Sequence, residues 1–244
     1  NDPERKRDEI DCKDRKHVHE DSGPQCVAHH VGHRLLEFER VSPIALQQAR
    51  VPARALGRAT IERLAASHFQ PDLIVTVDCA ITATAEVELA KQLGIEVIIT
   101  DHHQPSADGS IPDCIVVHPQ IGGYPFDGLC GTAVAYKLIE VLGKQLELDL
   151  SSDALDLVAI ATVADVMPLI GENRRLVRDG LNALRTTTRP GLQALLQSAE
   201  LSPAELDAQA IAFKLAPRLN APGRVRSATT SVELLLTPDE ERAH

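Results

Sequence analysis

Residues 71–78 read PDLIVTVD and residues 95–103 read IEVIITDHH, so each of two apolar, β-branched runs ends in an acid. Runs of this kind are typical of buried strands. The segment between them, 83–93, favours a helix, which makes one strand–helix–strand unit with parallel strands. Because ligands of such sheets bind at the carboxyl ends of the strands, we expect Asp78 and Asp101 to lie together at that edge.

The rest of the chain extends this unit into an α/β fold. A third strand is predicted at 114–117, and further helices are predicted at 60–67, 132–142, 154–164, 173–185, 191–197, 203–215 and 228–236. The predicted class is a parallel, Rossmann-like sheet flanked by helices, followed by a mostly helical second half. The helix at 154–164 is almost wholly apolar, so we expect it to be buried on all sides.

Composition narrows the class of protein. The chain has 244 residues and a net charge of −10, which argues against a protein that coats nucleic acid by bulk attraction but leaves room for a local basic groove. Its 5 cysteines form no CxxC pair, which indicates reduced thiols rather than a disulfide frame or a zinc ribbon. With no long apolar run and no signal peptide, the sequence predicts a cytoplasmic protein without a membrane partner.

The first 50 residues differ from the rest. They are charge-dense at the start and lack periodicity, so we expect a poorly ordered segment over 1–50 and a domain over 51–244. A short helix at 43–50 is the exception. His29, His30 and His33 lie close together, but no acid or cysteine stands at a suitable spacing, which favours a solvated segment over a metal site.

Two features of the sequence suggest metal binding. The Asp-His-His triplet at 101–103 offers hard and borderline ligands at a strand end. Asp165 closes the apolar helix at 154–164, where an unpaired buried carboxylate would be costly and where the helix dipole disfavours an anion. A metal ion would remove both objections. A cap for the next turn, or a salt bridge to Arg174 or Arg175, explains Asp165 equally well from spacing alone.

Two further motifs favour anions. Residues 216–226 read APRLNAPGRVR, in which three arginines surround a predicted Pro/Gly turn. Arginine forks suit phosphate, and glycine lets the backbone approach a ligand closely. An exposed turn with solvated arginines is the alternative. Residues 128–132 read GLCGT and lead into a helix, where a small-residue turn can hold an anion or form a tight connection.

Together these motifs resemble the DHH phosphoesterase superfamily, and within it the RecJ-type exonucleases specific for single strands. The resemblance covers roughly residues 70–240 in order and spacing. It is carried by TVDC at 76–79, TDHH at 100–103, ATVADVMPL at 161–169 with ENR at 172–174, and LAPRLNAPGR at 215–224, while LCGTAVAYK at 129–137 resembles the start of a helix in that family.

The resemblance implies a two-metal site that binds Mn²⁺ or Mg²⁺. It implies Asp78, Asp101, His102 and Asp165 as metal ligands, with His103 in or beside the coordination shell. Catalytic roles fall to Asp101, His102 and His103. Paired cations polarise a phosphodiester, generate a hydroxide and stabilise the leaving oxygen.

The resemblance also implies the partner. Arg218, Asn220, Gly223 and Arg224 would hold the phosphates of single-stranded DNA. The expected activity is exonucleolytic degradation of single-stranded DNA in repair and recombination, carried out by a monomer.

The sequence departs from the family in four places. No strand ending in Asp-x-Asp-Gly is found, Ala80 stands where glycine is usual, His118 stands where asparagine is usual, and the sequence stops at His244. We therefore expect a core fragment, truncated before the DHH-associated and nucleic-acid-binding domains and nearly inactive in isolation.

Other functions stay open. A small-substrate phosphoesterase such as an oligonucleotidase would need the same metals, but the arginine-rich motif favours the exonuclease. A catalytically silent binding or scaffold remnant is favoured by the missing acidic motif. A dinucleotide-binding oxidoreductase fits poorly, because no G-x-G-x-x-G follows a strand.

Overall fold

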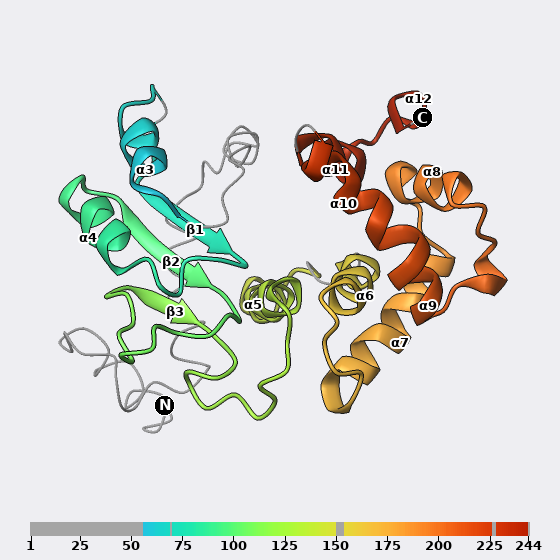
Figure 1. Ribbon diagram of the computed structural model, residues 1–244, viewed down its shortest axis with the longest axis horizontal. Coiled ribbons are helices and arrows are strands. Elements are labelled where there is room, and N and C mark those ends of the chain that lie inside the picture. The colour runs from blue at the N-terminus through green and yellow to red at the C-terminus, as the bar shows by residue number, and fades with distance from the viewer. Residues whose placement is uncertain (1–55, 69, 150–153, 226–227, 244) are drawn as a thin grey trace, which may run out of the picture.

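A computed structural model describes residues 56–68, 70–149, 154–225 and 228–243 (Figure 1). The predictions for the first 50 residues, including the histidine-rich segment at 29–33 and the helix at 43–50, lie outside the described residues. Figure 1 shows the sheet with α3 and α4 at one end of the molecule, α5 and α6 in the middle and α7 to α12 at the far end.

The sheet has three parallel strands in the order β1-β2-β3. Their bounds are Leu73–Val77 for β1, Glu96–Thr100 for β2 and Ile115–Val117 for β3. Val77 pairs with Thr100, and Thr100 pairs with Val117, so the three strands end in line at one edge. The predicted parallel α/β sheet is confirmed, and the loops that leave its carboxyl edge begin side by side.

Helices cover both faces of the sheet. On one face, α3 (Arg58–Ala65) and α4 (Thr84–Gln92) pack through Ile61 and Val87 against Val97 and Ile99 of β2. On the other face, Ile98 packs against Leu142 of α5 (Gly131–Leu146). Successive residues of a strand point to opposite faces, so this apolar run of β2 contributes to both layers of the core.

The second half is helical, as predicted. It comprises α6 (Leu155–Ala164), α7 (Gly171–Arg185), α8 (Pro190–Ser198), η3 (Pro203–Glu205), α9 (Ala208–Ala210), η4 (Ile211–Leu215), α10 (Ala216–Val225), α11 (Thr229–Leu236) and α12 (Glu240–Ala243). Helix α6 joins the two halves, because Val158 packs in a cluster with Ala133 of α5 while Ile160 packs in a cluster with Leu184 of α7.

Two local predictions in this half are wrong. Residues 203–215 do not form one helix: the chain makes a 3₁₀ turn at Pro203–Glu205 and restarts where the side chain of Asp207 accepts a hydrogen bond from the Ala210 amide (2.7 Å). The Pro/Gly stretch at 216–226 is not a turn, because 216–225 form α10 with Pro222 inside it. Packing explains the helix, since Leu215 is fully buried and Leu219 contacts the same apolar cluster.

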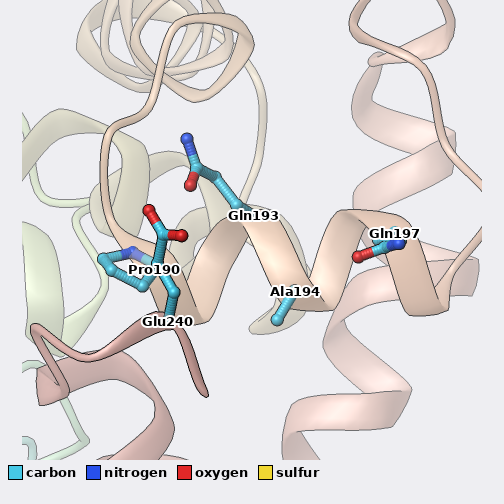
Figure 2. Close-up of a pocket in the computed structure, with 5 residues that line it drawn as sticks. All are labelled: Pro190, Gln193, Ala194, Gln197 and Glu240. Atoms are coloured by element: carbon cyan, nitrogen blue, oxygen red, sulfur yellow. The ribbon is translucent and has the colours of Figure 1, made fainter. Parts of the chain in front are cut away.

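A shallow hollow lies on the helical half, away from the strand ends. It encloses about 190 Å³ and is lined by Pro190, Gln193, Ala194, Gln197 and Glu240 (Figure 2). A single carboxylate among amides and apolar groups does not make a set of metal ligands. This hollow is therefore not the candidate functional site.

Candidate metal centre

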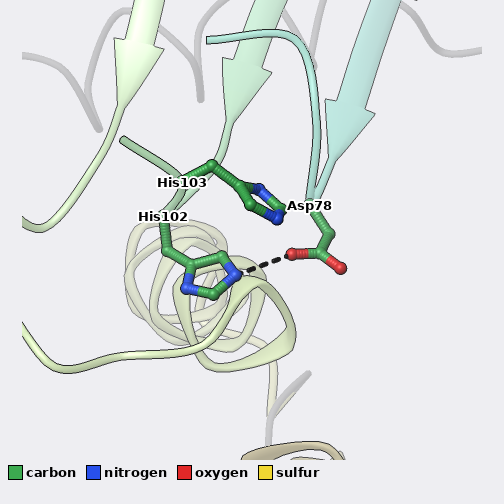
Figure 3. A group of neighbouring side chains, drawn as sticks. All are labelled: Asp78, His102 and His103. Atoms are coloured by element: carbon green, nitrogen blue, oxygen red, sulfur yellow. Dashed lines mark ion pairs between the residues drawn. The ribbon is translucent and has the colours of Figure 1, made fainter. Parts of the chain in front are cut away.

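The candidate site lies at the carboxyl edge of the sheet. Asp78 directly follows β1, the 101–103 triplet directly follows β2, and Asp165 directly follows α6. Figure 3 shows the side chains of Asp78 and His102 pointing toward one another, with His103 beside them. A hollow of about 390 Å³, lined in part by Asp78, Asp101 and His103, opens at this place.

His102 is the centre of the group. Its Nε2 atom lies 3.1 Å from Oδ1 of Asp78 and 3.4 Å from Oδ2 of Asp165. One possible ligand atom from each of Asp78, His102 and His103 can be chosen so that all lie within 4.8 Å of one another. The structure therefore brings together residues that the sequence places far apart, and their roles as ligands stay a prediction.

Asp101 lies beneath this group and has no exposed surface. Its Oδ1 atom accepts hydrogen bonds from the amides of His102 (2.8 Å) and His103 (3.2 Å) and from Nδ1 of His103 (2.7 Å). Its Oδ2 atom accepts from the Ile81 amide (2.9 Å). Burial alone would raise the pKa of Asp101, but these hydrogen bonds outweigh it and hold the pKa below its usual range.

This carboxylate orients the histidine beside it. Because Asp101 holds the Nδ1–H of His103, the Nε2 atom of that ring is left as the nitrogen available to a ligand. Carboxylates commonly fix the tautomer of metal-binding histidines in this way. The structure supports an orienting role for Asp101, and direct coordination by Asp101 stays a prediction.

His118 supports the same loop, which the sequence did not indicate. Its Nε2–H donates to the carbonyl of His103 (2.8 Å), and its Nδ1 accepts from the amide of Gln120 (3.2 Å). Burial lowers the pKa of His118 because it disfavours the charged imidazole. A neutral His118 with these two partners holds the backbone at His103.

Asp78 is held by close packing and by its backbone. Its φ of 63° lies in the left-handed region. A Cβ atom added at Gly131, the first residue of α5, would lie 2.2 Å from Oδ1 of Asp78. The small-residue turn at 128–132 therefore places the positive end of α5 against a carboxylate of the protein itself. Ala80 has a φ of 87°, which is the physical reason for glycine being usual there.

Asp165 is more exposed than the sequence predicted. Its side chain is 48% exposed, so it is not a buried carboxylate that needs neutralisation. Its partner is His102 rather than an arginine, and Arg175 pairs instead with Glu172 (3.2 Å). The residue after it, Val166, has a φ of 57°, a conformation that costs energy for a β-branched side chain.

The ion pair of His102 predicts a pH dependence of stability without metal. The hydrogen bond to Asp78 raises the pKa of His102 above 6.5, although burial opposes this. The pair should therefore contribute fully to the free energy of unfolding below the unfolded-state pKa, and the contribution should be lost as the pH rises through the higher folded-state value. Urea denaturation in EDTA should separate wild type from His102→Gln most at about pH 6 and least at about pH 9. A separation that grows with pH would contradict this.

The predicted nucleic-acid-binding residues lie on α10. Arg218, Asn220 and Gly223 are exposed, and Arg218 donates to the carbonyl of Lys214 (2.8 Å). The side chain of Arg224 is outside the described part of the chain. Among the described hydrogen bonds and ion pairs, none joins Arg218 to the carboxylates around His102, so the structure does not bring these predicted groups into one cluster.

The thiols of the described cysteines are held in their protonated form by burial. Burial raises the pKa of Cys79 and Cys130, and it raises the pKa of Cys114 to about 12. A protonated thiol is a poor nucleophile and a poor metal ligand. Within the described ranges, no helix has the length and apolar character needed to cross a membrane.

Comparison with known protein families shows which family the chain belongs to. The family model described as "DHH family, N-terminal domain" matches residues 11–162. The chain belongs to the DHH family. The match spans β1, β2, β3 and most of α6, so this membership makes the protein a DHH phosphoesterase domain, and the recognition made from the motifs is confirmed.

The relatives found by sequence are RecJ proteins. The chain is 44% identical to the single-stranded-DNA-specific exonuclease RecJ of Bacillus subtilis, over 70% of this chain and 21% of that protein. It is 38% identical to RecJ of Thermus thermophilus over 70% of this chain and 25% of that protein. It is 39% identical to RecJ of Escherichia coli over 67% of this chain and 31% of that protein. The chain thus spans less than a third of the length of these three relatives.

Solved structures agree with the fold. The crystal structure of an exonuclease RecJ bound to manganese superposes with a TM-score of 0.67 at 38% identity, over 75% of this chain and 45% of that one. RecJ of Thermus thermophilus in complex with Mg²⁺ gives a TM-score of 0.55 at 29% identity, over 91% of this chain and 37% of that one. The predicted α/β fold is therefore that of a RecJ-like DHH domain.

The donor set of this chain fits such cations. Carboxylate oxygens come from Asp78 and Asp165, and imidazole nitrogens come from His102 and His103. Oxygen ligands suit Mg²⁺, and the mixed oxygen and imidazole set suits Mn²⁺. Asp101 in addition fixes the ring of His103, one of these candidate donors.

Proposed function

We propose that this DHH domain hydrolyses the phosphodiester bonds of single-stranded DNA from an end, with Mn²⁺ or Mg²⁺ as cofactor. One observation carries the proposal, which is the convergence of Asp78 and Asp165 on His102 at the carboxyl edge of a parallel sheet. The similarity to RecJ proteins supports the choice of substrate.

The roles of the residues follow from their positions. Asp78, His102, His103 and Asp165 would hold the cations, and Asp101 would coordinate directly or act by fixing His103. The bound cations would supply a Lewis acid and a hydroxide nucleophile. Binding of a cation would displace the proton that His102 shares with these carboxylates, and that proton would be released to solvent.

The DNA would be held at its phosphates. Arg218, Asn220 and Gly223 are exposed on α10 and, with Arg224, form the proposed contact to the backbone of the strand. Contacts of this kind are weakened by salt, because each one releases condensed counterions. We propose a monomer acting on single strands in DNA repair and recombination.

Digestion of end-labelled single-stranded DNA tests the proposal. Because no Asp-x-Asp-Gly motif was found, we expect only slow release of mononucleotides from linear strands with Mn²⁺, no release from circular single strands and no release in EDTA. Asp78→Asn should lower the rate roughly 100-fold or more, since losing a ligand costs at least as much as losing an outer partner. Asp108→Asn, in an exposed loop, is the matched control and should leave the rate unchanged.

Other outcomes select the alternatives. Rapid cleavage of dinucleotides with no action on long strands would favour a small-substrate phosphoesterase. Binding of Mn²⁺ and DNA without any cleavage would favour a catalytically silent domain. Cleavage of circular strands would contradict attack from an end.

A further inference from the structure

Asn173 is a polar side chain with no exposed surface, in the first turn of α7. Its Nδ2 atom donates to two backbone carbonyls, that of Gly128 at 2.6 Å and that of Pro168 at 3.0 Å. Among the described residues, its Oδ1 atom has no hydrogen-bond partner. One amide group therefore ties together two loops that belong to different parts of the fold.

Other contacts join the same two loops. The ring of Phe126 fills the space beside two glycines, since an added Cβ would lie 3.0 Å from it at Gly128 and 2.9 Å from it at Gly171. The hydroxyl of Tyr124 donates to Oε2 of Glu172 (2.9 Å). The joint between the 124–128 loop and the start of α7 thus has an apolar part and a polar part, and Asn173 is its fully buried member.

Each of the two loops leads to one carboxylate of the metal centre. The first loop continues into Gly131, which packs directly against Asp78. The second loop contains Pro168 and begins at Asp165, immediately after α6. Asp78 and Asp165 both approach the Nε2 atom of His102, at 3.1 Å and 3.4 Å. Asn173 therefore joins the two loops that lead to these carboxylates.

Packing alone does not explain an asparagine here. A buried acceptor without a partner costs free energy, and leucine has a similar shape without polar atoms. What asparagine offers is a pair of donors on one rigid amide plane, which reach the carbonyls of Gly128 and Pro168 in two different loops.

We propose that Asn173 is a positioning residue, which sets the separation of the Asp78 and Asp165 carboxylates and thereby the affinity of the site for divalent cations. The effect on affinity rests on the proposed function. The effect of Asn173 on the two loops is independent of the proposed function, because it is measured in the metal-free protein. Residues that orient ligands without touching the metal commonly change its affinity 10–100-fold.

The test compares Asn173→Leu with wild type in two measurements. Calorimetric titration with Mn²⁺ should show an affinity that is roughly 10–100-fold weaker in the variant. Amide hydrogen exchange in EDTA should be faster by about 10-fold or more at Val166 and Met167 in the loop after α6, whose amides donate to the carbonyls of Val163 and Thr162 in the last turns of that helix. Circular dichroism verifies that the variant is folded.

Two further variants separate positioning from general stability. Leu184→Ala opens a cavity in the same helix, within the apolar cluster of the helical half. It should lower the melting temperature but leave Mn²⁺ affinity within about 2-fold of wild type. Asn173→Ala leaves room for a water molecule to reach the two carbonyls, so its affinity should fall between wild type and Asn173→Leu.

The outcomes are distinct. Unchanged exchange at Val166 and Met167 in both Asn173 variants overturns the inference, whatever the metal does. Equal Mn²⁺ affinity in wild type and Asn173→Leu would contradict the inference that Asn173 positions the metal ligands. Failure of the wild type to bind Mn²⁺ overturns the proposed function instead, and the exchange rates then still decide whether Asn173 holds the loops.

Discussion

Asp101→Asn should lower the free energy of unfolding by about 3–5 kcal/mol, the usual cost of removing one partner of a buried charged network. The carboxylate of Asp101 is completely buried and accepts four hydrogen bonds, three of them on Oδ1. An amide cannot accept on both of its ends. Whichever way the asparagine turns, its NH₂ group faces a donor of Ile81 or the donors of His102 and His103.

Urea denaturation in EDTA measures this effect without interference from metal. Asp108→Asn is the matched control, because its carboxylate lies in an exposed loop after the same strand, and it should change stability by less than about 0.5 kcal/mol. A variant at Asp101 as stable as this control would show that the hydrogen bonds do not hold an anion.

The same comparison has a defined dependence on pH. The folded-state pKa of Asp101 lies below 3.8, so the stability it contributes is present above 3.8 and is lost as the pH falls through the lower folded-state value. Wild type and Asp101→Asn should therefore converge in acid. The loss of the anion should also abolish tight Mn²⁺ binding, because His103 is no longer fixed through Nδ1.

Gly131→Ala should lower the free energy of unfolding by about 1–3 kcal/mol, the usual cost of overpacking a tight contact. An alanine in a helix is normally favoured over glycine by about 1 kcal/mol. Here the added methyl would lie 2.2 Å from Oδ1 of Asp78 and 2.6 Å from its Cβ. The carboxylate must therefore move, so Mn²⁺ affinity measured by calorimetry should fall by roughly 10-fold or more.

A double-mutant cycle isolates this contact. Asp78→Gly removes both atoms that meet the new methyl group, and glycine readily adopts the φ of 63° found at this position. In the Asp78→Gly background, Gly131→Ala should cost nothing or should stabilise the protein. An equal cost in both backgrounds would mean that the methyl group is opposed by something other than Asp78.

The sequence was informative where local periodicity and burial act in the same direction. Each strand was placed within a residue or two, because a short β-branched run that is buried on both faces has few other structures open to it. The same reasoning placed Asp78 and Asp101 at one edge, since the register of parallel strands fixes where they end. It was misleading at 203–215, where a turn that begins at Pro203 and a new start at Asp207 interrupt the expected helix. It was also misleading at 216–225, where packing of Leu215 and Leu219 outweighs the local signals of proline and glycine.

By itself, then, the sequence determined the parallel sheet and the acids and histidines at its carboxyl edge. The resemblance implied that Asp165 and His102 share a site, and the tertiary structure placed them 3.4 Å apart. Only the tertiary structure decided that Gly131 packs against Asp78 and that Asn173 joins the two loops behind them. Contacts of this kind are absent from local patterns, because they depend on how α5, α6 and α7 pack against one another and the sheet. The half-exposed Asp165 illustrates this, since its partner is set by where α6 ends in space rather than by the residues around it.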